Sequence, residues 1–348
     1  MTPVAFAIPG DITLATGGYA YDRRVLALLP QFGVRAHHVE LPGGFPAPTA
    51  ADLAGTQRLL ASLSPETIIL VDGLAYGAMP AGLIGALRNS IVALVHHPLC
   101  LEAGLGKARQ AELYALEKAA LILAKRIVVT SPITAATLTS DFAVPIEKIT
   151  VAEPGTDPAA RAHGTGAPLQ LLAVGSVVAR KAFDTLVHAL ASLRGHDWRL
   201  AIVGPTDRSA EALATLHAAI HETGLGSRIA LIGPVGSEKL DEFYASADLF
   251  VMPSLYEGYG MVLAEAMARG LPIVCTTGGA AAVTVPDGAA IKVPPGNEEL
   301  LGAAIRRLLD DAGLRRRLSD VSWTAGQKLP RWEDTTRTIA QVIRELAP

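Results

Sequence analysis

The sequence predicts an α/β protein built from two doubly wound, Rossmann-like domains. At 348 residues the chain is long for one hydrophobic core and of ordinary length for two. In both halves, short apolar runs alternate with helical patterns, as in parallel sheets whose strands are buried on both faces. Between the halves lies the stretch 153–168, EPGTDPAARAHGTGAP, which has no periodicity and is typical of a domain linker.

The first half contains six candidate strands. They are Val4–Ile8, Ala36–Glu40, Thr67–Val71, Ile91–Val95, Ile127–Thr130 and Ile149–Ala152. The longest helical pattern between them covers residues 107–125. Because right-handed crossovers join successive parallel strands, these elements predict a parallel sheet in an N-terminal domain at residues 1–157.

The second half repeats the alternation and predicts a C-terminal domain at residues 165–330. Its expected strands are Leu169–Gly175, Arg199–Gly204, Ile229–Gly233, Leu249–Met252, Ile273–Thr276 and Ala290–Val293. A last amphipathic helix, residues 332–346, follows Pro330. We expect the segment 331–348 to cross back and pack on the N-terminal domain.

Composition narrows the class of protein. A net charge of -3 offers no broad basic field, so nucleic acid is not expected as a partner. No apolar run approaches the ~20 residues of a membrane-spanning helix, although peripheral membrane contact stays open. The two cysteines, Cys100 and Cys275, lie in strand-like contexts and predict buried free thiols in a reducing, cytoplasmic compartment. The opening MTPVAFAIPGD lacks basic residues and is interpreted as the first strand, not a signal peptide.

The most informative pattern is PSLYEGYGMVLAEAMARGLPIVCTTGG at residues 253–279, directly after an expected strand. Gly258 and Gly260 open a helix whose free N–H groups and dipole favour an anion such as a diphosphate. Glu265, about one and a half turns into that helix, can accept hydrogen bonds from a pair of hydroxyls, and Glu257 can do so for a sugar ring. The ordinary alternative is a helix flanked by two surface carboxylates.

This pattern, with seven residues between Glu257 and Glu265 and a later VPDGAAIKVPPGN, resembles the family four (group 1) retaining glycosyltransferases. The resemblance implies the GT-B fold, in which two Rossmann-like domains face a central cleft. It implies transfer of a sugar from a nucleotide-diphosphate donor, bound by the C-terminal domain, to a hydroxyl of an acceptor bound by the N-terminal domain. By resemblance Glu257 contacts the transferred sugar, Glu265 the ribose, and Tyr259, Gly260 and Met261 the diphosphate.

The loop within LQLLAVGSVVARKAFDTLVHAL, residues 169–190, is a second part of the expected donor site. The family has an arginine directly after the strand glycine and a lysine at the loop's end, and both stabilise the departing diphosphate. Lys181 matches the lysine, but Ser176 stands at the arginine position. Arg180, next to Lys181, is a candidate replacement for that charge. As bare sequence, both basic residues also fit a solvated helix start.

Other strand ends complete the expected site. By resemblance Gly204 and Pro234 line the nucleobase pocket, whereas Tyr244 and Leu240 are interpreted as packing residues in preference to base contacts. No Asp-x-Asp or zinc-ligand spacing occurs, so neither a metal nor a cofactor beyond the donor substrate is expected.

In the first half, Gly17 and Gly18 precede a helix, where close backbone approach to a donor or acceptor is possible. His96 and His97 close the strand Ile91–Val95, and we expect at least one to contact ligand, with His96 the direct match to a family histidine. A plain turn and backbone-satisfied histidines are the alternatives.

The function expected from these patterns is retaining transfer from a nucleotide sugar, with UDP- or GDP-sugars favoured, to a hydroxyl of a small molecule or a lipid, the small molecule being preferred. Two alternatives stay open: a GT-B epimerase acting on nucleotide sugars, and a non-catalytic nucleotide-sugar-binding protein. Ser176 is the feature that favours the second.

Overall fold

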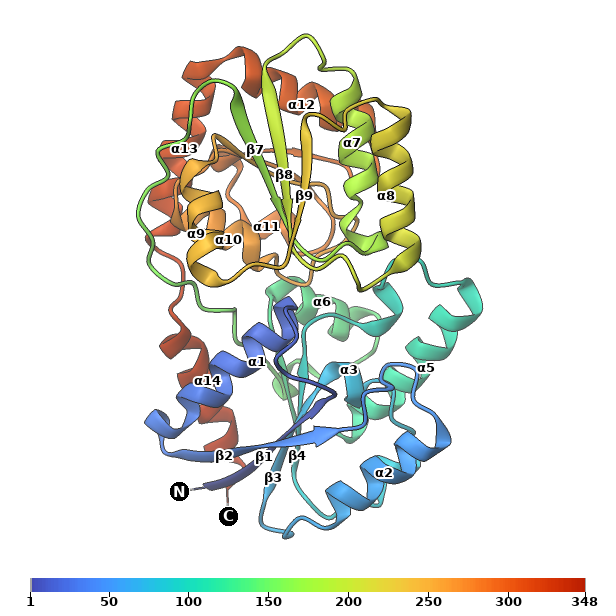
Figure 1. Cartoon of the computed structure of the whole chain (residues 1–348). Coiled ribbons are helices and arrows are strands. Elements are labelled where there is room, and N and C mark those ends of the chain that lie inside the picture. The colour runs from blue at the N-terminus through green and yellow to red at the C-terminus, as the bar shows by residue number, and fades with distance from the viewer. Residues whose placement is uncertain (1, 348) are drawn as a thin grey trace. The chain divides into compact units, whose positions relative to one another are not determined.

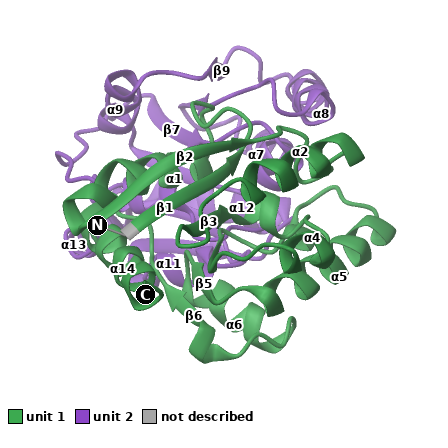
Figure 2. Ribbon diagram, turned by 90° about the horizontal axis from the view of Figure 1, so that it is seen from below, with its two compact units in different colours: residues 1–155, 330–348 green, residues 156–329 purple. Residues whose placement is uncertain are grey.

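The computed structural model describes residues 2–347 and divides the chain into two compact units (Figures 1 and 2). Unit 1 comprises residues 1–155 and 330–348, and unit 2 comprises residues 156–329. Each unit contains one six-stranded sheet. Within the described residues, no helix has both the length and the apolar character needed to cross a bilayer.

The sheet of unit 1 is parallel throughout and has the order β2-β1-β3-β4-β5-β6. Its strands are β1 (Thr2–Pro9), β2 (Val34–Leu41), β3 (Ile68–Asp72), β4 (Ile91–Val95), β5 (Arg126–Val129) and β6 (Ile149–Val151). Every residue of β3 and β4 is buried, which explains why these strands appear in the sequence as continuous apolar runs without alternation.

Within the described residues, unit 1 contains seven helices. They are α1 (Gly17–Leu28), α2 (Ala50–Ala61), α3 (Gly73–Tyr76), α4 (Ala81–Gly85), α5 (Lys107–Leu123), α6 (Pro132–Ser140) and α14 (Trp332–Glu345), with short 3₁₀ turns at Leu29–Phe32, Leu99–Leu101 and Ile146–Lys148. Side chains cap several of these helices as the sequence would favour: Thr49 and Asp52 form a reciprocal capping box at α2, and Ser131 caps α6.

The last helix, α14, packs against α1, as Figure 1 shows in red and blue. Trp332 is 5% exposed, its ring lies edge-on to Tyr21 at 5.7 Å between centroids, and the Arg24 guanidinium lies 5.4 Å above it. Thr335 donates a hydrogen bond of 2.6 Å to the carbonyl of Glu153. The C-terminal helix is therefore an integral part of unit 1.

The sheet of unit 2 is also parallel, with the order β12-β11-β10-β7-β8-β9. Its strands are β7 (Leu169–Val174), β8 (Trp198–Val203), β9 (Ile229–Gly233), β10 (Leu249–Met252), β11 (Ile273–Thr276) and β12 (Ala290–Val293). Its helices are α7 (Phe183–Ala191), α8 (Ala210–Glu222), α9 (Ser237–Ser246), α10 (Met261–Ala268), α11 (Ala281–Thr284), α12 (Glu298–Asp310) and α13 (Ala312–Gly326), with 3₁₀ turns at Ala179–Lys181 and Asp287–Ala289.

All twelve strands expected from the sequence are present, and five of them, β4 and β9 to β12, have the expected bounds. The largest differences are at β1 and β2, which begin at Thr2 and Val34 instead of Val4 and Ala36 because Thr2 pairs with Val34. Cys275 lies buried in β11 as expected, but Cys100 lies in a 3₁₀ turn and not in a strand. Both thiols are unpaired.

The Pro- and Gly-rich stretch 153–168 has no helix or strand, but it is not a free linker. Asp248 accepts hydrogen bonds from the backbone N–H groups of Gly166 at 3.1 Å and Gln170 at 2.8 Å. The N–H of Ala162 donates to the carbonyl of Arg269 at 2.9 Å. Because side-chain and backbone groups of the folded unit hold this stretch, unit 2 begins at residue 156 and not at residue 165.

Candidate functional site

Glu257 follows β10 and is held by the loop that follows β11. Its backbone N–H donates to the carbonyl of Gly278 at 3.1 Å, and its own carbonyl accepts from the N–H of Ala280 at 2.8 Å. The residue is 6% exposed. The carboxyl ends of two neighbouring strands therefore fix the position of this carboxylate.

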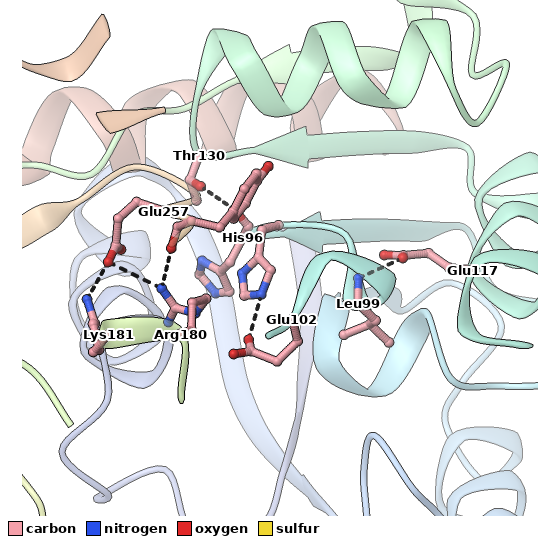
Figure 3. Close-up of polar contacts among 10 residues, drawn as sticks. His96, Leu99, Glu102, Glu117, Thr130, Arg180, Lys181 and Glu257 are labelled. Carbon is pink, nitrogen blue, oxygen red and sulfur yellow. Dashed lines mark hydrogen bonds and ion pairs between the residues drawn. The ribbon is translucent and has the colours of Figure 1, made fainter. Parts of the chain in front are cut away.

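Two cations face the Glu257 carboxylate (Figure 3). The Lys181 Nζ atom lies 2.6 Å and an Arg180 guanidinium nitrogen 3.3 Å from Glu257 Oε1. Burial alone would raise the pKa of Glu257, but the charges of Lys181 and Arg180 lower that pKa to about 2. The cluster has one more positive than negative charge, and its side chains are at most 17% exposed. The interpretation of these basic residues as a solvated helix start is therefore wrong.

The geometry of the basic loop depends on its contact with the Glu257 loop. Residues 179–181 form a 3₁₀ turn, and the Arg180 carbonyl accepts a hydrogen bond of 2.8 Å from the N–H of Leu255. The Arg180 guanidinium also donates to the Tyr256 carbonyl at 2.8 Å. These contacts orient Arg180 toward the Glu257 carboxylate. Arg180 does so from the end of the loop opposite Ser176, the position at which the sequence lacks an arginine.

The ends of β7, β8 and β9 meet at the same edge of the sheet as Glu257. Gly204 has φ +145°, and a Cβ at this position would lie 2.2 Å from the Gly175 carbonyl oxygen, so only glycine fits. The N–H of Gly204 donates to the Gly233 carbonyl at 3.0 Å, and Pro234 follows directly. The structure therefore brings Ser176, Gly204 and Pro234 to one sheet edge.

Helix α10 begins beside Glu257. Gly260, at φ +90°, occupies its N-cap position, and no side chain of the described residues caps this end. The Leu263 N–H donates to the Gly260 carbonyl at 2.8 Å, so the first-turn N–H groups that can face an anion are those of Met261 and Val262. Gly258 and Met261 flank this turn, but the Tyr259 side chain is 7% exposed and packs in the core, so only the Tyr259 backbone can contact a diphosphate.

Glu265 lies on α10 and is only partly buried. Its Oε2 atom accepts a hydrogen bond of 2.7 Å from the Tyr244 hydroxyl, a contact that the sequence did not indicate. Burial raises the pKa of Glu265, while the Tyr244 hydrogen bond and the Arg269 charge oppose that rise. Tyr244 is fully buried and stacks on Phe250 at 5.8 Å. Tyr244 is therefore a packing residue, as the sequence analysis expected, and its hydroxyl also orients Glu265.

In unit 1, Gly17 and Gly18 form the first turn of α1, after Thr16, whose hydroxyl caps the helix. A Cβ on Gly18 would lie 3.3 Å from His96 Cδ2, so the absence of a side chain lets the helix start approach the histidine. His96 follows β4, and Thr130 donates a hydrogen bond of 3.0 Å to its carbonyl (Figure 3). The two motifs expected in this half of the chain therefore meet.

His96 and His97 face different carboxylates. His97 Nε2 lies 3.1 Å from Glu102, whereas His96 Nε2 lies 3.3 Å from Asp22 and 3.6 Å from Asp72. Burial would lower the pKa of His96, but the neighbouring Asp22 and Asp72 carboxylates raise it to about 10. His96 is thus the histidine beside the glycine turn.

Sequence reasoning missed Asp22 and Asp72. The sequence did offer one indication of Asp72, because a polar residue ends the otherwise apolar strand β3. Asp22 lies one helical turn after Gly18. Ligand atoms of these aspartates and His96 lie within 4.8 Å of one another, and within the described chain they form the only such group of three. Asp22 and Asp72 lie 3.3 and 3.6 Å from His96 Nε2, within the distance of an ion pair.

Two family models match the chain. The model described as Glycosyl transferase 4-like domain matches residues 10–155, and the model described as Glycosyl transferases group 1 matches residues 160–322.

Among curated proteins, the chain is 28% identical over 329 residues to an MMP alpha-(1->4)-mannosyltransferase of Mycolicibacterium hassiacum, covering 87% of this chain and 77% of that protein. It is 34% identical over 190 residues to a D-inositol 3-phosphate glycosyltransferase of Nocardia farcinica, covering 51% of this chain and 41% of the relative. The matches to proteins of that second name cover between 40% and 51% of their length.

Solved structures share the fold. Sucrose-phosphate synthase from Thermosynechococcus elongatus superposes with a TM-score of 0.82 at 22% identity, covering 98% of each chain. WaaG, a glycosyltransferase involved in lipopolysaccharide biosynthesis, superposes with a TM-score of 0.71 at 19% identity, covering 98% of this chain and 99% of WaaG.

The two parallel six-stranded α/β sheets and these likenesses define the GT-B fold. The chain belongs to the group 1 glycosyl transferases, family four, and is a retaining glycosyltransferase that takes its sugar from a nucleotide sugar.

Proposed function

We propose that unit 2 binds a UDP- or GDP-hexose and that the enzyme transfers the hexose to a hydroxyl of a small polar acceptor held by unit 1, without a metal ion. The observation that carries this proposal is the cluster of Lys181, Arg180 and Glu257 at the sheet edge where α10 begins. A buried cluster with surplus positive charge, beside uncapped N–H groups, is suited to a diphosphate.

Within this proposal Lys181 and Arg180 stabilise the negative charge that develops on the leaving diphosphate. Arg180 supplies the charge that Ser176 lacks, since it faces the same carboxylate as Lys181 at 3.3 Å. Glu257 accepts hydrogen bonds from the hydroxyls of the transferred sugar. Glu257 forms ion pairs with both cations. When the donor binds, its diphosphate competes with Glu257 for these two positive charges.

The remaining donor contacts follow the strand ends. The backbone from Gly258 to Met261 holds the diphosphate, and Gly204 and Pro234 lie at the base. Glu265, oriented by Tyr244, holds the ribose hydroxyls through the carboxylate oxygen that Tyr244 does not occupy.

Transfer with retention forms the bond between the acceptor oxygen and the anomeric carbon on the face from which the phosphate oxygen departs. The bond between the anomeric carbon and that phosphate oxygen breaks, and the acceptor's proton passes to the departing phosphate. Lys181 and Arg180 stabilise this step as fixed charges, so no protein group needs to remove the proton.

A small polar acceptor is favoured by the names of the relatives. The D-inositol 3-phosphate glycosyltransferases and mannosylfructose-phosphate synthase carry names that point to small phosphorylated compounds. A lipid-linked acceptor is the alternative, since WaaG is named for lipopolysaccharide biosynthesis.

The test is calorimetric titration of the protein with UDP-, GDP-, ADP- and dTDP-sugars. We expect one base to be preferred, and Glu265→Ala to weaken binding of that donor about tenfold or more, which corresponds to loss of one charge-assisted hydrogen-bond pair. The matched control is Glu242→Ala, which removes an exposed glutamate of α9 in the same unit.

Binding of no donor would contradict the proposal. Donor binding without a glycosylated product, given a range of acceptors, would favour the non-catalytic alternative that Ser176 suggested. Release of an epimerised nucleotide sugar would favour the epimerase.

A further inference from the structure

In unit 1, His96 forms a buried charged cluster with two aspartates, Asp22 and Asp72. Asp22 is 0% exposed, Asp72 is 2% exposed, and both carboxylates lie against the same imidazole nitrogen. The Asp72 Oδ1 atom also accepts a hydrogen bond of 2.6 Å from the Leu74 N–H at the start of α3. For the Asp22 carboxylate, His96 is the ion-pair partner within the described chain.

The titratable groups that face His96 come from two elements. Helix α1 supplies Asp22 and Tyr21, whose ring lies edge-on to the imidazole at 5.2 Å, and β3 supplies Asp72. Burial and the Asp72 charge raise the pKa of Asp22, whereas for Asp72 the effect of burial is outweighed by His96, and its pKa is lowered. Because the two carboxylates share one buried site, repulsion between them disfavours ionisation of both, so one keeps its proton while the other is ionised.

Charge balance fixes the state of the imidazole. With a neutral imidazole the group would hold an uncompensated buried negative charge, which is costly in a protein interior. With an imidazolium, the ionised carboxylate and the cation compensate each other. The Nε2 atom of His96 is sealed from solvent, while the side chain as a whole is 22% exposed. The exposed part therefore belongs to the rest of the side chain, on which Nδ1 is the remaining polar atom.

We propose that Asp22 and Asp72 are positioning residues that hold His96 as an imidazolium, so that its Nδ1–H acts on the ligand as a fixed donor and positive charge and never as a base. The part of this inference that concerns a ligand rests on the proposed function; the protonation state does not. A permanently protonated His96 is unable to take the acceptor's proton, which agrees with transfer of that proton to the departing phosphate.

The first test is a titration of the histidine ring ¹⁵N shifts of the intact protein by NMR between pH 5.5 and 9.5, values chosen to bracket the ordinary histidine pKa of about 6.5. His96 is assigned as the signal absent from His96→Gln. We expect both ring nitrogens of His96 to stay protonated through pH 9. A midpoint near 6.5, or a neutral tautomer at pH 7.5, would overturn the proposal. A metal ion bound in stoichiometric amount would overturn it as well.

The second test uses Asp72→Asn and Asp22→Asn. We expect each to lower the His96 midpoint by at least one pH unit, and kcat/KM to fall above the new midpoint while the wild-type profile shows no such fall. Glu102→Gln is the matched control, because it removes a carboxylate from the neighbouring His97 and leaves the His96 group intact.

An unchanged His96 midpoint in both aspartate variants would contradict the proposal. If neither variant folds, the wild-type titration still decides the protonation state. If the protein binds no donor, the proposed function fails, yet the titration result stands independently.

Discussion

Lys181 and Glu257 are separated by 76 positions in the chain, yet their side chains form an ion pair of 2.6 Å. Each residue could be identified from the sequence, because each lies shortly after a buried strand at the edge where ligands of such sheets bind. Their contact with each other could not be identified. It depends on the hydrogen bond between the Arg180 carbonyl and the Leu255 N–H, which no residue pattern encodes.

Replacing Lys181 tests this pair at the residue scale. In Lys181→Met, Glu257 keeps Arg180 but loses its nearer cation, so its pKa should rise from about 2 toward the ordinary value. We expect kcat to fall by roughly 10²- to 10³-fold and the free energy of unfolding by about 1–3 kcal/mol. Product assays and urea denaturation measure the two effects.

Lys239→Met is the control for that substitution, because its ion pair with Glu242 is exposed and should contribute at most about 1 kcal/mol. Transfer close to the wild-type rate in Lys181→Met would contradict the role given to this lysine.

At the scale of the elements, the strands were the easiest feature to predict and the short helices the hardest. Buried parallel strands leave continuous apolar runs with sharp ends, so β9 to β12 were predicted to the residue. Helices of four or five residues, such as α3 and α4, complete too few turns to produce a periodic pattern. Asp72 caps α3, which is one reason why its partnership with His96 was missed.

Helix α5 carries a buried carboxylate that should make the stability of unit 1 depend on pH. Glu117 is 1% exposed and accepts a hydrogen bond of 2.9 Å from the Leu99 N–H (Figure 3). Burial raises its pKa from 4.5 to about 8, against the opposing effect of that hydrogen bond. The folded state therefore keeps a proton that the unfolded chain releases above pH 4.5, and stability should decline from there to about pH 8.

Glu117→Gln should remove this decline, since an amide can accept the same hydrogen bond and does not ionise. We expect the variant to exceed the wild type by at least about 1 kcal/mol at pH 8.5, as expected for a shift of more than one pKa unit, with a smaller difference at pH 5. Urea denaturation at both pH values measures this. If the free energy of unfolding of the two proteins changed equally with pH, the prediction would be contradicted. The control is Glu112→Gln, which replaces an exposed glutamate on the same helix.

At the scale of the whole molecule, unit 1 is assembled from both parts of the chain that flank unit 2. The amphipathic pattern after Pro330 indicated a helix, and the structure shows what it covers: Trp332 packs on Tyr21 and beneath Arg24. The point of contact is tight, because a Cβ on Gly155 would lie 2.2 Å from the Trp332 backbone nitrogen. This close approach involves backbone atoms far apart in the sequence and therefore leaves no local signal.

Trp332→Ala should consequently destabilise unit 1 alone. We expect a loss of about 3–5 kcal/mol, as for other large buried aromatic residues, with the unfolding of unit 2 unchanged. Differential scanning calorimetry with hydrogen exchange can assign the transitions to the units. A uniform shift of both units would show that they unfold together. The control is Trp323→Ala, which alters α13 of unit 2 and should affect only that unit.

The division of unit 1 also sets the order in which the protein can mature on the ribosome. Residues 1–155 are synthesised before unit 2, but their sheet lacks α14 until the whole of unit 2 has been made. At elongation rates of about 5–20 residues per second, this delay lasts on the order of ten seconds or more. Unit 2 begins later in the chain, but all its helices and strands have been made before the last helix of unit 1. The surface around Tyr21, on which Trp332 packs, therefore stays uncovered until the last part of unit 1 has been made.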